Sequence, residues 1–208
     1  MSKKILKIAL KSGIINKTLL GGGLMKTVCD GQVYIVLSQS GSLVSRFLKF
    51  ITKDDFNHVS IALNEQPQVM YSFGRRFCYY PFWSGFVVES SNFGTFKRFQ
   101  NTRAVVLSLD VNEDNYLKIK TQISSMLKKQ YRFHYNYLGV LFSPFKINVH
   151  TKHSFYCSQF VKDILEKNGV LQENTLPTVS KPVDFLEIDG VTKIFDGKLK
   201  DFSLNIAN

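Results

Sequence analysis

The sequence predicts an α+β fold in which an antiparallel sheet packs against helices. An apolar run at 32–37 and the two halves of a hairpin at 58–63 and 68–73 have the composition of strands, and further strands are expected at 85–89 and 104–110. Apolar residues at helical spacing predict helices at 42–51, at 113–130 and again after Cys157, and a turn at 64–67 joins the hairpin. An aromatic loop is expected at 131–145, and a short helical or extended tail after Pro182. An order of strand, helix, hairpin, strands and two late helices is typical of an α+β protein.

The chain divides into a basic N-terminal segment, residues 1–23, and one domain, residues 24–208. A chain of 208 residues is long enough to fill a single core. Lysines alternate with apolar residues over 1–20, which predicts an amphipathic helix, and Gly21-Gly22-Gly23 then forms a flexible joint. This helix either binds an anionic membrane or packs on the domain, and the sequence leaves both open.

The composition indicates a globular protein with an anionic partner. Apolar residues make up 44% of the chain and aromatic residues 13%, which excludes a disordered protein. The net charge of +11 suits an anionic surface such as acidic lipid, or simply a solvated basic surface. No helix-turn-helix, zinc-finger or RNA-recognition string accompanies the basic residues, so we expect no specific nucleic-acid partner.

The sequence carries no clear export or membrane-spanning signal. Lys7 and Lys11 interrupt the apolar residues near the N-terminus, and no run approaches the roughly 18 apolar residues of a membrane span. The three cysteines are too widely spaced for a disulfide framework or a zinc site. We therefore expect a cytoplasmic protein that can attach peripherally to a membrane, with no metal and no cofactor.

Cys157 is the first candidate for a reactive group. It follows an aromatic run and precedes a helix whose apolar face includes Phe160, Ile164 and Leu165, with Gly169 as the stop. Unpaired N–H groups and the positive end of the helix dipole in the first turn favour a thiolate. A small buried core residue is the alternative for a lone cysteine.

His58, at the head of the predicted strand 58–63, is the candidate proton acceptor. A thiolate nucleophile needs a base, and the pair of Cys157 and His58 fits that chemistry. A histidine that opens a strand can equally be structural.

Two strings resemble the circularly permuted papain-like proteins of the NlpC-type superfamily, the YiiX-like group. They are Asn57–Leu63, with its early histidine strand, and Phe155–Val161, with its late cysteine helix. Lecithin:retinol acyltransferase is similar more distantly and has the same order of histidine before cysteine. The resemblance covers about residues 30–168 and implies a papain-like fold in permuted order.

By this resemblance, Cys157 is the nucleophile and His58 the base. The family's third residue orients the imidazole from the strand beside the histidine strand, and counting across the hairpin places it at Tyr71 or Ser72. Neither is a carboxylate, which departs from many relatives. Gln159 stands where many of them have Glu.

The resulting expectation is a thiol hydrolase or acyltransferase that acts on an amide or ester bond in a small-molecule, lipid-linked or peptide substrate. Aromatic stretches such as 79–83 suit an apolar acyl chain, although ordinary packing explains them equally well. The alternative is a non-catalytic module with a degraded site that binds a membrane or a protein.

Overall fold

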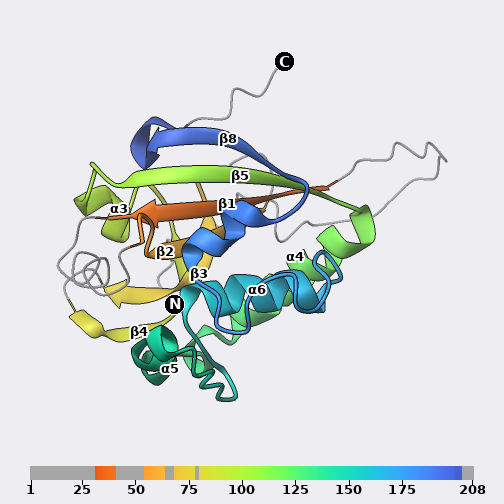
Figure 1. The fold of residues 1–208 in the computed structure, drawn as a ribbon. Helices are drawn as coiled ribbons and strands as arrows, with labels where there is room; N and C mark the ends of the chain where they lie inside the picture. The colour runs from red at the N-terminus through yellow and green to blue at the C-terminus, as the bar shows by residue number, and fades with distance from the viewer. Residues whose placement is uncertain (1–30, 41–53, 64–67, 78–79, 203–208) are drawn as a thin grey trace.

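The computed structural model describes residues 31–40, 54–63, 68–77 and 80–202, and their architecture is α+β as predicted (Figure 1). Strands in the described residues form one eight-stranded sheet in the order β7-β6-β4-β3-β2-β1-β5-β8. The strands are β1 (Gly31–Gln39), β2 (His58–Leu63), β3 (Met70–Phe77), β4 (Tyr80–Glu89), β5 (Arg103–Val111), β6 (His134–Tyr135), β7 (Ser154–Phe155) and β8 (Val191–Lys198). The α-helices are α3 (Gly94–Arg98), α4 (Glu113–Lys128), α5 (Tyr137–Phe142) and α6 (Cys157–Lys167). The 3₁₀ helices are η1 (Gln130–Arg132), η2 (Ser143–Phe145), η3 (Pro182–Glu187) and η4 (Leu199–Asp201).

The central strand β1 is buried on both faces. It pairs antiparallel with β2 on one side and with β5 on the other. Side chains alternate across a strand, so Val33, Ile35 and Leu37 face one side while Tyr34 and Val36 face the other. Both sets are fully or almost fully buried, which explains the continuous apolar run.

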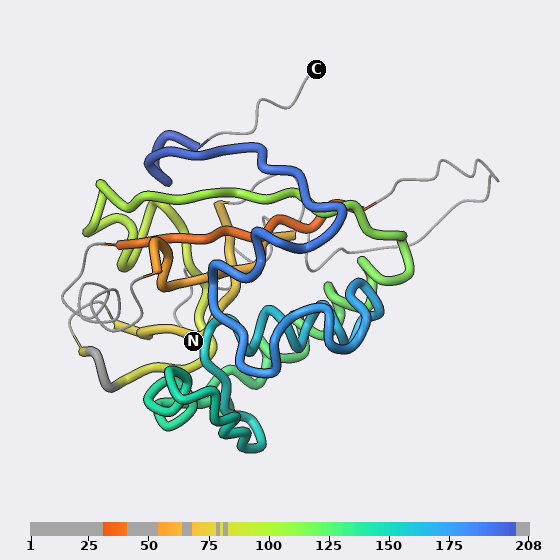
Figure 2. Tube along the Cα trace, viewed as in Figure 1, coloured from red at the N-terminus to blue at the C-terminus, as the bar shows by residue number. Residues whose placement is uncertain are grey.

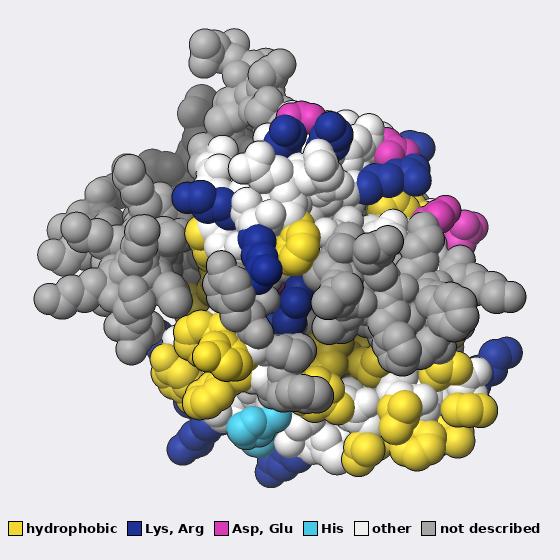
Figure 3. Space-filling view, turned by 90° about the vertical axis from the view of Figure 1, so that its left-hand side faces the viewer, with side chains coloured by type: hydrophobic (Ala, Val, Ile, Leu, Met, Phe, Trp, Pro, Cys, Tyr) yellow, Lys and Arg dark blue, Asp and Glu magenta, His cyan; other side chains and the backbone are white. Residues whose placement is uncertain are grey.

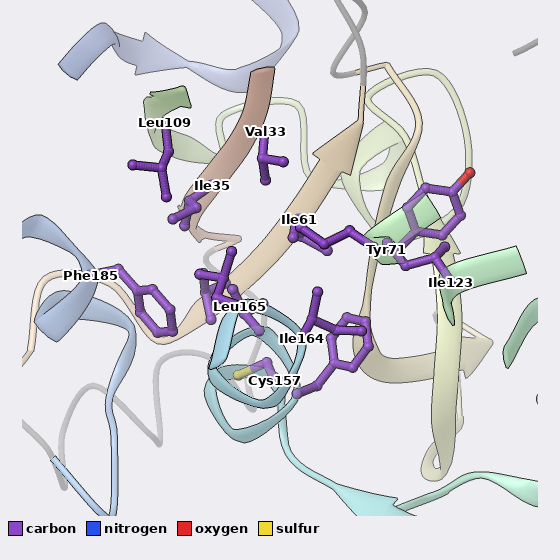
Figure 4. Packing of buried hydrophobic residues seen from close by; sticks show 14 of the residues in the cluster. Val33, Ile35, Ile61, Tyr71, Leu109, Ile123, Cys157, Ile164, Leu165 and Phe185 are labelled. Carbon is purple, nitrogen blue, oxygen red and sulfur yellow. The ribbon is translucent and has the colours of Figure 1, made fainter. Parts of the chain in front are cut away.

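Helices α4 and α6 cover the first face of the sheet and form the main core with it. Ile119 and Ile123 lie one turn apart on α4, and Ile164 and Leu165 occupy the inner side of α6. Figure 4 shows Ile164 and Leu165 pointing toward the strand that carries Ile61, with Cys157 at the start of the same helix. Full burial of an aliphatic or aromatic side chain contributes about 1.5–3 kcal/mol, so this layer fixes α6 firmly on the sheet.

A smaller apolar cluster covers the opposite face. Phe96 of α3 and Leu199 of η4 pack there against β1 and β5. After α6, the chain runs back beside that helix and then up to β8 at the far edge of the sheet (Figure 2).

Two expectations from the sequence need correction. The sheet is mixed, because β6 and β7 pair in parallel; the long connection between them, which contains α5, permits this. The stretch 131–145, expected as a loop, contains β6, α5 and η2. The tail beyond Pro182 is helical and extended as expected: it consists of η3 and an edge strand, β8, that pairs with β5.

Several expectations fall outside the described residues. These are the N-terminal helix and glycine joint of residues 1–23, a predicted helix at 42–51 and the hairpin turn at 64–67. Within the described ranges, no helix combines the length and the apolar character needed to cross a bilayer.

Candidate active site

Helix α6 begins at Cys157, as its sequence pattern predicts. Tyr156 precedes it in an extended conformation, and the Tyr156 N–H donates to the side-chain oxygen of Gln159 at 3.3 Å. This is the returning half of a capping box. Gly169 follows the helix with a φ of 71°, a left-handed conformation that favours glycine. The first-turn N–H groups beside Cys157 lack intrahelical acceptors and can stabilise negative charge.

Gln159 also joins the start of α6 to the α5 region. Its side-chain oxygen accepts a hydrogen bond from Asn136 Nδ2 at 3.0 Å, and the same nitrogen donates to the Val149 carbonyl at 2.6 Å. Asn136 Oδ1 in turn caps α5 by accepting from the Gly139 N–H at 2.9 Å. The side chain of Gln159 therefore positions the loop that faces Cys157.

His58 contacts a carboxylate through Nε2. The two oxygens of Glu89 lie 2.9 and 3.0 Å from this nitrogen. Ser60 Oγ donates to Glu89 Oε2 at 2.6 Å and lies 3.3 Å from the same imidazole nitrogen. Glu89 ends β4, which is separated from β2 by β3, so the contact crosses a strand.

An irregularity between β2 and β3 makes room for this contact. The two strands pair only at Ile61–Tyr71 and Ala62–Met70. Closer to His58, Ser72 Oγ donates to the Val59 carbonyl at 2.7 Å and replaces a backbone partner. On β3, a Cβ atom at Gly74 would lie 3.4 Å from Glu89 Oε1 and 3.5 Å from His58 Cε1. A residue larger than alanine there would enter the space where the imidazole and the carboxylate meet.

The surroundings of His58 raise the pKa of its imidazole. Burial alone lowers the pKa of the imidazole, but the negative charge of Glu89, hydrogen bonds to Cys157 and Glu89, and the charge of Cys157 together raise it from 6.5 to about 10. Among these contributions, those of Cys157 show that its thiol is within interaction range of the imidazole. Nε2 is the ring nitrogen that contacts Glu89.

Two tyrosines flank Cys157 and remain neutral phenols. Burial raises the pKa of Tyr135 well above its usual range, and the charge of an ionised Cys157 raises it further. Burial also raises the pKa of Tyr156 to about 12, with added contributions from Cys157 and Asp184. Both hydroxyl groups are therefore potential hydrogen-bond donors beside the sulfur at neutral pH.

Cys157 is 5% exposed and lines a cavity of about 690 Å³. One wall comes from α5 and η2, and the opposite wall from residues 177–184. Ser158 Oγ holds the second wall by donating to the Ser180 carbonyl at 2.7 Å. Lys146 and the ion pair of Lys181 with Asp54, at 3.3 Å, add charge to a lining that also contains apolar side chains. The cavity can admit a substrate with both apolar and charged parts.

Glu89, rather than the predicted Tyr71 or Ser72, contacts the imidazole of His58, and the charge of Cys157 acts on the same imidazole. The Tyr71 ring is buried in the main core, where it stacks on Phe86. Ser72 is bonded to a backbone carbonyl. The expectation failed because the count across the hairpin stopped at β3, whereas the carboxylate comes from the next strand. A usable signal was a glutamate at the end of the otherwise apolar strand predicted at 85–89.

A group of three or more His, Cys, Asp or Glu side chains placed to hold a metal ion is not found among the described residues. Cys157 is the free cysteine there, whereas Cys29 and Cys78 lie outside the described ranges. Comparison with protein-family models and with curated proteins finds no match to this chain.

Proposed function

We propose that this protein is a cysteine-dependent hydrolase or acyltransferase that uses Cys157, His58 and Glu89. The observation that carries the proposal is the convergence of these three side chains from α6, β2 and β4. In this set the thiol is the nucleophile, the imidazole is the base, and the carboxylate orients the imidazole.

In the first step, the Cys157 sulfur attacks the carbonyl carbon of an amide or ester. As the sulfur attacks, the thiol gives up its proton to His58, whose raised pKa of about 10 makes it a proton acceptor. As the tetrahedral intermediate collapses, the C–N or C–O bond breaks and His58 gives its proton to the departing amine or alcohol. A thioester on Cys157 remains.

In the second step, water or another acceptor attacks the thioester carbon. His58, now neutral, takes a proton from the attacking group, the C–S bond breaks, and the cysteine is restored. Water gives hydrolysis, and an alcohol or amine gives acyl transfer. Glu89 keeps the imidazole oriented through both steps and stabilises its positive charge.

Negative charge on the carbonyl oxygen needs hydrogen-bond donors. The Cys157 N–H at the start of α6 is one, in keeping with its place at the positive end of the helix dipole. Tyr135 lines the same cavity, and its hydroxyl is a suitable second donor because its raised pKa keeps it protonated.

The arrangement of elements supports a circularly permuted papain-like fold as part of the proposal. The histidine strand β2 precedes the cysteine helix α6 in the chain, and α6 packs on the sheet that carries the histidine. A non-catalytic binding module is less favoured, because Glu89 supplies the carboxylate that neither Tyr71 nor Ser72 could provide.

A substrate screen tests the proposal. The wild-type protein and Cys157→Ala are incubated with libraries of acyl esters, lipid-linked amides and peptide amides, and products are followed by mass spectrometry. We expect turnover by the wild type only, and a mass increase on Cys157 that hydroxylamine removes, as it does a thioester. Equal product formation by both proteins would contradict the proposal.

A further inference from the structure

A cluster of exposed apolar side chains lies beside the Cys157 cavity. Most of the residues 137–147 with large apolar side chains point to solvent, including Leu141 at 64% and Phe145 at 71% exposure. We call this set the 137–147 ridge; its members are Tyr137, Leu138, Leu141, Phe142, Phe145 and Ile147. Hydrophobic side chains gather along the lower edge of the face in Figure 3, the same edge at which α5 lies in Figure 1. Such a cluster is typical of a docking surface.

The ridge is a folded feature. Leu138, Leu141 and Phe142 fall at i, i+3 and i+4 of α5 and therefore share one side of the helix. The Lys146 N–H donates to the Ser143 carbonyl at 3.0 Å, and the Ile147 N–H donates to the Phe142 carbonyl at 3.4 Å. The backbone thus holds these apolar side chains outward on a defined surface.

The charge around the ridge identifies its partner. No Asp or Glu stands between Asp114 and Asp163, while that stretch carries several Lys and Arg residues, with Lys146 inside the ridge itself. Apolar side chains beside cations match the boundary between acyl chains and anionic headgroups. A second copy of this chain is a poor fit, because the two ridges would bring like charges together.

We propose that the 137–147 ridge docks this protein on anionic lipid membranes. Leu138, Leu141 and Phe145 enter the acyl boundary, and the neighbouring cations contact the headgroups. The ridge and the basic residues 1–23 are different segments of the chain, and binding through the ridge does not depend on catalysis.

The ridge and the cavity share a segment of chain. Val140 and Pro144 line the Cys157 cavity, while their neighbours Leu141 and Phe145 point to solvent. Docking therefore brings the cavity mouth to the bilayer surface. If the proposed function holds, the substrate is an acyl ester or amide drawn from the membrane, with Lys146 placed to meet its anionic headgroup.

Vesicle co-sedimentation of the full-length protein tests the docking. Phosphatidylcholine vesicles with and without phosphatidylglycerol are compared for the wild type and for Leu138→Ser/Leu141→Ser/Phe145→Ser. We expect the triple variant to bind the anionic vesicles about a hundredfold more weakly. A matched control, Leu117→Ser/Ile194→Ser, changes exposed apolar residues on α4 and on β8 at the opposite edge of the sheet, and should bind within about twofold of the wild type. Thermal unfolding of each variant verifies that it is folded.

Insertion is measured separately by fluorescence. Trp83 is the single tryptophan of the chain, so a Trp83→Phe/Phe145→Trp variant reports from the ridge alone. We expect its emission to shift to the blue on anionic vesicles and to be quenched by brominated lipid. Cys157→Ala should bind vesicles as the wild type does, which separates the docking from the proposed chemistry.

Two results would overturn the proposal. One is binding to anionic vesicles that the triple ridge variant leaves unchanged. The other is a wild-type dimer, detected by sedimentation in the absence of lipid, that the triple variant converts to a monomer while neither protein binds vesicles.

Discussion

The two halves of the sheet are built differently. The regular half contains β1 and β5, and the irregular half contains β2, β3 and β4. Between β1 and β5 the register runs unbroken from Gly31–Val111 to Gln39–Arg103, with apolar side chains buried on both faces. Between β2 and β3 the pairing is limited to two positions, and the side chain of Ser72 supplies a further bond. His58 and Glu89 lie in the second half.

This difference has a physical cause. A complete ladder between apolar strands leaves no space in which two charged side chains can meet. A buried charge without such a partner is costly. Where β2 and β3 separate, and where Gly74 has no side chain, His58 and Glu89 can meet and satisfy each other. The regular half provides stability, and the irregular half accommodates the polar groups.

The largest effect on stability is expected in the regular half. Ile35→Ala removes a fully buried side chain at the centre of β1 and should lower the free energy of unfolding by about 2–5 kcal/mol. Urea unfolding measures this change. Alkylation of Cys157 in the folded protein should keep its rate, and a strong loss of Cys157 reactivity would show that the two halves are coupled.

In the irregular half, Ser72→Ala should lower the free energy of unfolding by about 1–3 kcal/mol, because it leaves the buried Val59 carbonyl without this donor. Ser108→Ala, on β5 in the regular half, is the matched control and should cost less than about 0.5 kcal/mol. Equal losses in the two variants would argue against a compensating role for Ser72.

The charged pair should make stability depend on pH. The pKa of His58 is raised from 6.5 to about 10 on folding, so the pair stabilises the protein fully below pH 6.5 and loses this effect as pH rises through 10. The His58 contribution to the slope is at most about 1.4 kcal/mol per pH unit. Urea unfolding at several pH values should show a smaller slope in Glu89→Gln than in the wild type. An unchanged slope would mean that Glu89 does not set the charge of His58.

The smallest effect is expected at Gly74. In Gly74→Ala the added Cβ makes ordinary contacts of 3.4 and 3.5 Å, so unfolding free energy should change by less than about 1 kcal/mol and Cys157 reactivity should persist. In Gly74→Val the larger side chain should displace the imidazole and slow alkylation of Cys157. Similar alkylation rates in the two variants would show that Gly74 does not shape the site.

Periodicity was sufficient to predict the main sheet and the long helices. The apolar run of β1 and the helical spacing in α4 and α6 follow directly from burial. The strands β6 and β7 have two residues each and therefore no period. The α5 region was expected as a loop because it is rich in aromatic residues, and its helix of six residues is too short to show a clear period.

The site was predictable only in part for a similar reason. Cys157 and His58 stand at the starts of a helix and a strand, positions that local patterns reveal. The contact of Glu89 with His58 crosses β3, so it depends on the register of three strands and on the absence of a side chain at Gly74. A sequence does not specify register between strands that are not neighbours.

The central claim is that His58 and Glu89 activate Cys157, and the pH dependence of its alkylation tests this most directly. Iodoacetamide is used in a Cys29→Ser/Cys78→Ser background, so that Cys157 alone reports. At pH 7 we expect His58→Ala to react about tenfold more slowly or worse, and Glu89→Gln to fall between that variant and the parent protein. Rates in both variants should approach the parent rate as the pH rises. Equal rates at neutral pH in all three proteins would contradict the account.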